Sequence, residues 1–168
     1  VRGGTGNDTI YDGDQGYDRL YGEDGRDTIY AGANAADTTA NQNEWWQYNT
    51  VVGGQGGDRM YGSTEADIFI YEGSTRAELI AESSTTSSAR DYITNFYLGD
   101  KIQFENADSV QFFSSGSANA YNVEAGTLGL SIRYEKNASV LNWEGGGLET
   151  ASRIFVDVAD ENGQFDDI

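Results

Sequence analysis

Residues 3–11 read GGTGNDTIY, with three glycines within four positions, then an aspartate and a triplet of β-prone residues. Glycine weakens the interior of a strand because it loses more conformational freedom on folding than any other residue. The glycines therefore indicate a tight turn, and the Thr9–Tyr11 triplet indicates a minimal strand that follows it. Side chains alternate along a strand, so Ile10 is expected to face inward.

The same unit recurs along the first 70 residues. Each copy has a Gly-rich hexad that ends in Asp, or once in Asn, and the successive ends are 10, 9, 10, 12, 9 and 9 residues apart. The copy ending at Asp37 is weaker, because Thr-Thr-Ala follows it. The hexads end at Asp8, Asp18, Asp27, Asp37, Asn49, Asp58 and Asp67. The expected inward residues are Ile10, Leu20, Ile29, Thr39, Val51, Met60 and Phe69.

One unit cannot bury its own apolar residue, but stacked units can, and their triplets then pair as parallel sheets. Two units make a turn of about 18 or 19 residues, so alternate units lie above one another. This predicts an all-β fold with a parallel β-roll. The extra residues Asp12 and Ala31 predict a bulge at one edge. One side is expected to carry Asp8, Asp27, Asn49 and Asp67, and the other Asp18, Asp37 and Asp58.

The charge balance restricts the partners. The chain has 10 Lys and Arg against 28 Asp and Glu, no His and no Cys, and a formal net charge of −18. Such a chain repels nucleic acid and anionic membranes, and no apolar run is long enough to span a bilayer. Thiolate chemistry, a His base for a Ser nucleophile and an H-E-x-x-H zinc site are excluded, and no carboxylate pair is singled out for glycoside hydrolysis. We therefore expect no catalysis within this chain.

Stacked carboxylates are costly unless a cation lies between them, and turn carbonyls supply further oxygen ligands. An oxygen-only, irregular, many-ligand site suits Ca²⁺ better than Mg²⁺, which demands tight octahedral geometry. An acidic, glycine-rich disordered linker is the alternative. A disordered linker would not need an Asp followed two residues later by an apolar residue, repeated at regular spacing along the chain.

Residues 3–70 resemble the RTX calcium-binding nonapeptide family, G-G-x-G-x-D-x-U-x. The stretches GGTGNDTIY and GGQGGDRMY match fully, and GEDGRDTIY matches with one glycine missing. The resemblance implies a β-roll that folds on binding about three to five Ca²⁺, and export by type I secretion machinery. It also implies a secreted, extracellular bacterial protein, of which this chain is expected to be one module.

The resemblance also implies the ligands. Each ion lies between two turns and takes the second and fourth carbonyls and the Asp of the lower turn, with the first and third carbonyls and the Asp of the upper turn. The first site then uses Gly4, Gly6, Asp8, Gly22, Asp24 and Asp27. The second uses Asp14, Gly16, Asp18, Gly32, Asn34 and Asp37, and the third uses Ala33, Ala35, Asp37, Gly53, Gln55 and Asp58. A site at Asn49 is expected to be weak or absent, because a carboxylate is lost.

The Gly-rich hexads do not continue into the second half of the chain. STRAELIAES (74–83) predicts a short helix with Ser74 or Thr75 as N-cap, and RDYITNFYLGDKIQF (90–104) predicts two strands and is similar to the segment after the roll in serralysin-type proteases. Further strands are predicted at 127–134, 139–143 and 153–158. We expect residues 1–70 to form the roll, with an inserted loop near 40–48. Residues 71–168 are expected to form a β-rich cap and secretion region.

Two questions stay open at this stage. Asp91 and Asp100 are either further calcium ligands or, as we favour, ordinary turn carboxylates. Trp45, Trp46 and Tyr48 either form a sugar-stacking platform or pack against the roll. The main functional hypothesis is a calcium-dependent folding and export module that stabilises its parent protein. The alternative is a polysaccharide-binding accessory module, as in alginate epimerases or adhesins. An ice-binding surface would need a long, flat Thr/Asn ladder, and Thr5-Gly6-Asn7 occurs once.

Overall fold

The structure is a computed structural model of the 168-residue chain. It describes residues 1–13, 16–32, 48–83, 89–107, 109–113, 129–141 and 148–158. The chain divides into two compact units. Unit 1 comprises Val1–Glu72 and Ala81–Glu105, and unit 2 comprises Gly73–Ile80 and Asn106–Ile168.

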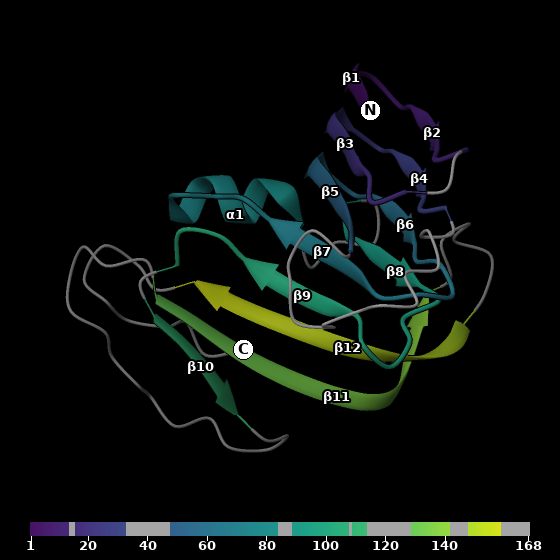
Figure 1. Ribbon diagram of the computed structural model, residues 1–168. Coiled ribbons are helices and arrows are strands. Elements are labelled where there is room, and N and C mark those ends of the chain that lie inside the picture. The colour runs from purple at the N-terminus through teal and green to yellow at the C-terminus, as the bar shows by residue number, and fades with distance from the viewer. Residues whose placement is uncertain are drawn as a thin grey trace. The chain divides into compact units, whose positions relative to one another are not determined.

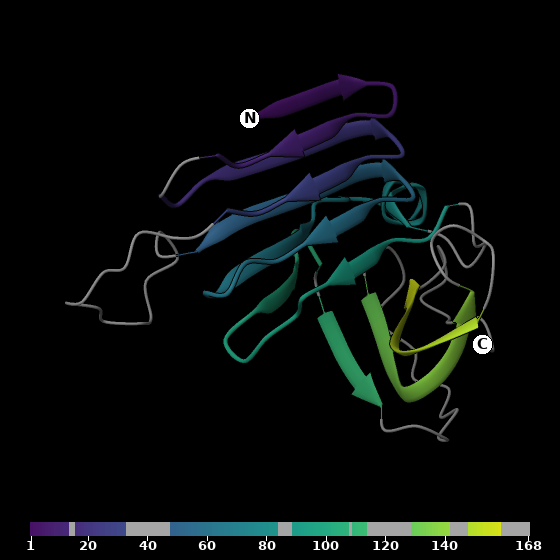
Figure 2. The same cartoon turned by 90° about the vertical axis from the view of Figure 1, so that its right-hand side faces the viewer.

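Unit 1 is a parallel β-roll, which confirms the predicted fold class. Successive strands alternate between two sheets, so each strand pairs in parallel with the strand two places along the chain (Figures 1 and 2). The first sheet has the order β1 (Arg2–Thr5), β3 (Arg19–Gly25), β5 (Asn49–Gly56), β7 (Asp67–Tyr71) and β9 (Lys101–Phe104). The second sheet has the order β2 (Thr9–Tyr11), β4 (Thr28–Tyr30), β6 (Arg59–Tyr61) and β8 (Tyr92–Thr94).

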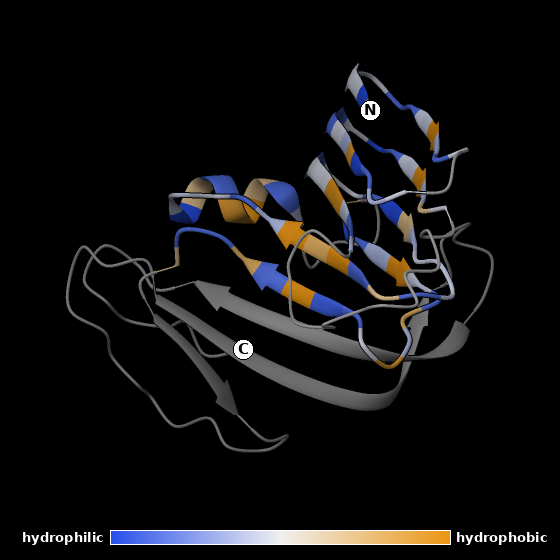
Figure 3. Cartoon of the chain, in the orientation of Figure 1, coloured by the Kyte–Doolittle hydropathy of each residue, from blue (hydrophilic) through white to orange (hydrophobic). Residues whose placement is uncertain are grey.

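The core of the roll is one column of apolar side chains from each sheet. The middle residue of each triplet is buried, as predicted, and apolar and polar residues alternate along the strands (Figure 3). The core comprises Ile10, Leu20, Ile29, Val51, Met60 and Phe69, with Ala31, Ile93 and Ile102 packed against it. Thr39, the remaining predicted inward residue, lies outside the described residues.

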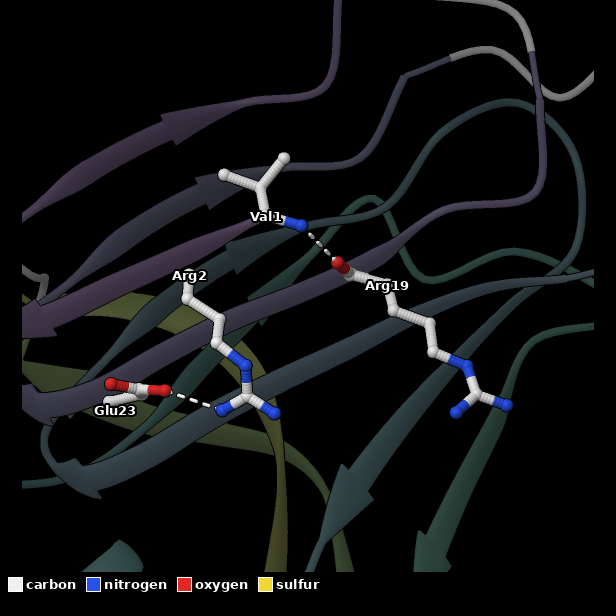
Figure 4. Close-up of polar contacts among 4 residues, drawn as sticks. All are labelled: Val1, Arg2, Arg19 and Glu23. Carbon is white, nitrogen blue, oxygen red and sulfur yellow. Dashed lines mark hydrogen bonds and ion pairs between the residues drawn. The ribbon is translucent and has the colours of Figure 1, made fainter.

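The hexads place glycine where the backbone requires it. The second and fourth positions of the hexads that end at Asp8, Asp27 and Asp58 adopt positive φ, with φ of 103° at Gly4 and 118° at Gly6. L-residues rarely adopt such angles, which explains the glycine code. Glu23 stands at a second position with φ of 75°, where the family pattern has a glycine. Its carboxylate pairs with Arg2 at 2.5 Å across the exposed edge of β1 and β3, beside the bond from the Val1 amino group to the Arg19 carbonyl (Figure 4).

The roll is longer than the predicted boundary at residue 70. Strands β8 and β9 continue the two sheets, and unit 1 includes residues up to Glu105. The segment predicted as two strands of a cap therefore forms the last rungs of the roll. DYI at 91–93 and DKI at 100–102 keep the order of Asp and inward apolar residue without the glycines.

The predicted bulge at Asp12 and Ala31 is wrong. The register between β2, β4 and β6 runs without a shift. The Asp12 N–H donates to the Tyr30 carbonyl at 3.0 Å, and the Ala31 N–H to the Tyr61 carbonyl at 2.9 Å. The extra residues thus extend the ladder at its end instead of interrupting it. Next to them, the rings of Tyr11, Tyr30 and Tyr61 stack in a row, with centroids 4.6 and 4.5 Å apart.

Helix α1 (Arg76–Glu82) confirms the predicted helix and selects Thr75 as its N-cap. The Glu78 N–H donates to Thr75 Oγ1 at 3.2 Å, and the Thr75 N–H donates to the Glu78 carboxylate at 3.1 Å. These two bonds form a capping box. The Ser74 hydroxyl and N–H, which donate to the Glu78 carboxylate at 2.7 and 2.8 Å, lower the pKa of Glu78 most, and the Thr75 bonds lower it further. No helix in the described part of the chain is long and apolar enough to cross a membrane.

Unit 2 contains a three-stranded sheet in the order β10 (Ser109–Phe113), β11 (Gly129–Leu141) and β12 (Leu148–Val158). Strand β11 is parallel to β10 and antiparallel to β12. The segments predicted as separate strands at 127–134 and 139–143 contribute to a single strand, β11, whose register shifts between Glu135 and Ala138. The strand predicted at 153–158 is the end of β12, and β10 was not predicted.

The core column predicts a large effect of one truncation. Leu20 is fully buried, so Leu20→Ala is expected to lower the free energy of unfolding by about 2–5 kcal/mol through lost burial and a residual cavity. Urea denaturation at fixed calcium concentration measures the effect. The control is Thr9→Ala on the exposed side of β2, expected to change stability by no more than about 0.5 kcal/mol. Equal effects of the two substitutions would contradict this core.

Candidate metal centre

The last residues of the hexads form two columns, one on each side of the roll. In column 1, formed by Asp8, Asp27, Asp58 and Asp91, each N–H donates to Oδ1 of the next member. The distances are 2.7 Å from Asp8 to Asp27, 2.7 Å from Asp27 to Asp58 and 2.8 Å from Asp58 to Asp91. Column 2 contains Asp18, Asn49, Asp67 and Asp100.

This arrangement corrects the predicted assignment of sides. Asp58 is the neighbour of Asp27 in column 1, whereas Asn49 and Asp67 lie in column 2 with Asp18. The sequence count treated the Asp37 copy as a half-turn, but the 31 residues from Asp27 to Asp58 make one full turn of the roll. The predicted pairings of Asp18 with Asp37 and of Asp37 with Asp58 are therefore wrong.

Several predicted ligands lie outside the described residues. These are Asp14, Ala33, Asn34, Ala35 and Asp37, together with Trp45 and Trp46 of the proposed sugar platform. Tyr48 is described and is 8% exposed. Its ring lies 4.3 Å from the Lys101 ammonium, which also donates to its hydroxyl at 3.1 Å. Tyr48 therefore packs against the roll and does not present a free face to a sugar.

Column 1 has one unused oxygen on every member. Oδ2 of Asp8, Asp27, Asp58 and Asp91 is buried and has no hydrogen-bond partner. Asp27 and Asp58 are also fully buried as whole residues. A buried carboxylate oxygen without a partner is energetically costly unless a cation neutralises it. Column 1 is thus a row of acceptor oxygens that the protein itself leaves open.

The carbonyls of the turns face the same spaces. A Cβ at Gly3 would lie 2.9 Å from Asp8 Oδ2 and 2.8 Å from the Gly22 carbonyl oxygen of the next turn. A Cβ at Gly22 would overlap Asp27 Oδ2 and the Gly53 carbonyl oxygen. The Glu23 and Gly25 carbonyl oxygens point at Gly54 and Gly56 of the turn above. Carboxylate and carbonyl oxygens from two turns therefore converge between successive members of column 1.

The side chains alone are too few to enclose an ion. Among the described residues, no group of three or more acidic side chains gathers closely enough to hold a metal. Any ion in column 1 must therefore take several ligands from the backbone. Hard oxygen ligands in an irregular arrangement of this kind are typical of Ca²⁺.

Column 2 is closed by hydrogen bonds of its own. Asn49 is fully buried; its Oδ1 accepts from the Asp18 N–H at 3.0 Å, and its Nδ2 donates to the Gly32 carbonyl at 2.9 Å. Oδ2 of Asp67 accepts from the Ser63 N–H at 2.6 Å and the Ser63 hydroxyl at 3.0 Å. The other oxygen of Asp67, Oδ1, is buried without a hydrogen-bond partner, and the Asn49 side chain lies near the Asp67 carboxylate.

Burial shifts the protonation of these carboxyls. It raises the pKa of Asp58 to about 7 and that of Asp67 to about 6. Burial also raises the pKa of Asp27 and, more strongly, that of Asp91. In both Asp58 and Asp91, the bond from a backbone N–H opposes the rise, and the neighbouring carboxylate of the column adds to it. Without a cation, Asp58 in column 1 therefore binds a proton up to near-neutral pH.

Sequence reasoning missed part of this site. Asp91 was set aside as a turn carboxylate, although Asp91-Tyr92-Ile93 repeats the Asp-x-apolar order that ends the glycine hexads. The carbonyls of Glu23 and Gly25 were not among the predicted ligands, because the repeat count placed Asn49 above Asp27, where the structure places Asp58.

The close approach of Gly53 to its own aspartate predicts a glycine requirement. A Cβ at Gly53 would lie 2.5 Å from Asp58 Oδ2, so the turn must shift. Gly53→Ala is expected to lower the free energy of unfolding by about 1–3 kcal/mol and to weaken metal binding, because the substitution crowds the open oxygen. The matched control is Gly13→Ala, since a Cβ there meets nothing within 4 Å. Thermal denaturation at fixed calcium concentration compares them, and equal melting temperatures would contradict the packing.

The raised pKa values predict a pH dependence of the metal-free chain. Folded Asp58 binds a proton up to pH of about 7, whereas the unfolded carboxyl releases it near its ordinary 3.8. The folded state therefore holds more protons between these values, and its stability falls as pH rises through that window. In calcium-free buffer, the melting temperature is expected to be higher at pH 5 than at pH 8, and Asp58→Asn is expected to reduce the difference. A metal-free melting temperature that rises with pH would refute this assignment.

The repeat architecture agrees with a known sequence family. Residues 2–35 and 49–73 match the RTX calcium-binding nonapeptide repeat in four copies. No curated protein and no solved structure matches the chain. The matched residues contain the first three members of column 1 and the turns between them. The N-terminal part of this chain therefore carries RTX calcium-binding nonapeptide repeats.

Proposed function

We propose that this chain is a calcium-dependent folding module of a larger secreted bacterial protein, and that its ions lie along column 1. One observation carries the proposal. Each member above Asp8 uses Oδ1 to hold the backbone of the rung below, and all four members leave Oδ2 buried without a partner. RTX repeats bind Ca²⁺, and this geometry supplies an open anionic oxygen at each rung.

Two sites fall within the matched repeats. We assign to the site between Asp8 and Asp27 the ligand set expected from the family pattern, with the carbonyls of Gly4, Gly6, Gly22 and Asp24. The Asp24 carbonyl also accepts from the Gly6 N–H at 2.8 Å, so its second lone pair would face the ion. The register of the turns extends that pattern to a site between Asp27 and Asp58. We assign to this second site the carbonyls of Glu23, Gly25, Gly53 and Gln55.

Calcium binding would control folding through charge. The chain carries a net charge of −18, and bringing the column together buries several carboxylates. Each bound Ca²⁺ cancels two negative charges and supplies the missing partners. An ion that binds only the folded state stabilises that state by RT ln(1 + [Ca²⁺]/Kd) per site, so stability rises with calcium concentration. Sites of the extracellular class, with Kd of about 0.1–1 mM, would fill after export and stay empty at cytosolic calcium levels.

This coupling explains the proposed export route. Type I secretion machinery would carry an unfolded, calcium-free chain, and extracellular calcium would then drive folding and stabilise the parent protein. The proposed role within this chain is structural and not catalytic. A total of about three to five ions remains our expectation. The described residues offer no support for polysaccharide binding, since Tyr48 is buried.

Far-UV circular dichroism during a calcium titration tests the proposal, with Mg²⁺ as the control ion. We expect a cooperative gain of β-structure with Ca²⁺ and none with Mg²⁺. Asp27→Asn is expected to raise the calcium midpoint at least about tenfold, because Asp27 borders both sites and each loses a charged ligand.

The matched control is Asp24→Asn, which removes the same charge from an exposed side chain of the same turn. Its midpoint is expected to stay within about twofold of the unsubstituted chain. The same β-spectrum in chelator and in calcium would refute the folding switch. Equal midpoints for the two variants would refute the placement of the ions in column 1.

A further inference from the structure

We propose that Asp58 and Asp91 form a third calcium site, beyond the residues that match the repeat family. The match ends at residue 73, whereas column 1 continues to Asp91. This inference rests on the proposed function, because it extends the same column by one rung. It assigns a metal ligand in a segment whose sequence lacks the glycine hexad.

The backbone brings Asp91 into the position that the repeats give to their last residue. Strand β8 pairs in parallel with β6, with Met60 opposite Ile93. The Tyr92 N–H donates to the Asp58 carbonyl at 2.7 Å, and the Arg59 N–H donates to the Asp27 carbonyl one rung below at 2.8 Å. The last rung therefore repeats the backbone geometry of the rung within the matched repeats.

The side chains repeat it as well. Asp91 Oδ1 accepts from the Asp58 N–H at 2.8 Å, as Asp58 Oδ1 accepts from the Asp27 N–H at 2.7 Å. Oδ2 of both Asp58 and Asp91 is buried without a hydrogen-bond partner. Asp58 is 0% exposed, so water cannot supply the missing partner at its open oxygen. Two buried carboxylates one rung apart, each with an open oxygen, call for a cation between them.

Neighbouring side chains hold Asp91 in place. The Tyr71 hydroxyl lies close enough to the Asp91 carboxylate to favour its charged form, whereas Asp91 Oδ2 is itself buried and makes no hydrogen bond. The Asp91 N–H donates to Ser83 Oγ at 3.0 Å, so a serine after α1 positions a residue that no glycine turn precedes. The Glu82 carboxylate is buried nearby and accepts from the Glu72 N–H at 3.1 and 3.2 Å. Glu82 adds negative potential at both Asp58 and Asp91, which favours a cation further.

Asp100 provides the contrast in column 2. It also follows the matched repeats, and its Oδ1 accepts from the Asp67 N–H at 2.9 Å. Its Oδ2, however, accepts from the Tyr97 N–H at 2.7 Å within its own turn. Both oxygens of Asp100 are therefore engaged. The two carboxylates that look alike in the sequence are assigned different roles, Asp91 to an ion and Asp100 to a turn.

The third site would link two residues that are far apart in the sequence. Asp58 and Asp91 are 33 residues apart, and β7 and α1 lie between them. An ion shared by these two residues joins the last matched turn of column 1 to the strand that ends the second sheet. Calcium would then stabilise the roll beyond its recognisable repeats.

Ion counting by native mass spectrometry, on chains exchanged into a calcium-containing volatile buffer, tests the proposal. We expect Asp91→Asn to bind one Ca²⁺ fewer than the unsubstituted chain. Asparagine retains the oxygen that holds the Asp58 N–H and loses the charge. The matched control Asp100→Asn is expected to bind the same number as the unsubstituted chain.

The outcomes separate this inference from the proposed function. An unsubstituted chain that binds no calcium would refute both. A chain that binds calcium, with an equal count for Asp91→Asn, would overturn the third site alone. If Asp91→Asn does not fold at saturating calcium, anomalous scattering from Ca²⁺-loaded crystals of the unsubstituted chain decides. A peak about 2.3–2.6 Å from Oδ2 of Asp58 and of Asp91 supports the site, and no peak there overturns it.

Discussion

The roll depends on one repeated interaction, the hydrogen bond from the N–H of each column 1 aspartate to Oδ1 of the next. This bond sets the rise from turn to turn and aligns the carboxylates. It also uses only one of the two oxygens and leaves Oδ2 of every member without a hydrogen-bond partner; a carbonyl oxygen of the next turn lies near Oδ2 of Asp8 and of Asp27. The contact that builds the fold therefore also builds the row of open oxygens in which we propose that calcium binds.

The apolar core of the roll is small. Each half-turn buries one large side chain, such as Leu20 or Phe69. Ordering a glycine-rich backbone costs more conformational entropy than ordering other sequences. Backbone hydrogen bonds offset part of this cost. The buried, like-charged carboxylates add to it, and bound cations remove that penalty.

The two sides of the roll solve the same problem in different ways. Column 1 keeps a carboxylate at every member and leaves an oxygen open for an ion. In column 2, the Asn49 amide donates to the Gly32 carbonyl, and Ser63 donates to Asp67. A neutral amide brings its own donor, so it needs no cation to be satisfied when buried. The roll thus joins one side suited to respond to calcium with one side held largely by side-chain hydrogen bonds.

Local sequence determined the units of this fold. The glycines at the second and fourth positions of the hexads mark positive φ, and the Asp-x-apolar order marks the turn end and the buried residue. These features act over a few residues, so a single sequence reveals them. The triplets, their inward side chains and the helix after Thr75 were therefore predictable.

The tertiary structure decided which units lie above one another. Asp58 pairs with Asp27, and Asp91 with Asp58, across separations of 31 and 33 residues. Counting repeats could not give these partners, because the 31 residues from Asp27 to Asp58 make one turn of the roll and the rung at Asp91 has no glycines. Register between parallel strands depends on packing of the shared core and on closure of the backbone ladder. Both are properties of the assembled roll and not of any one repeat.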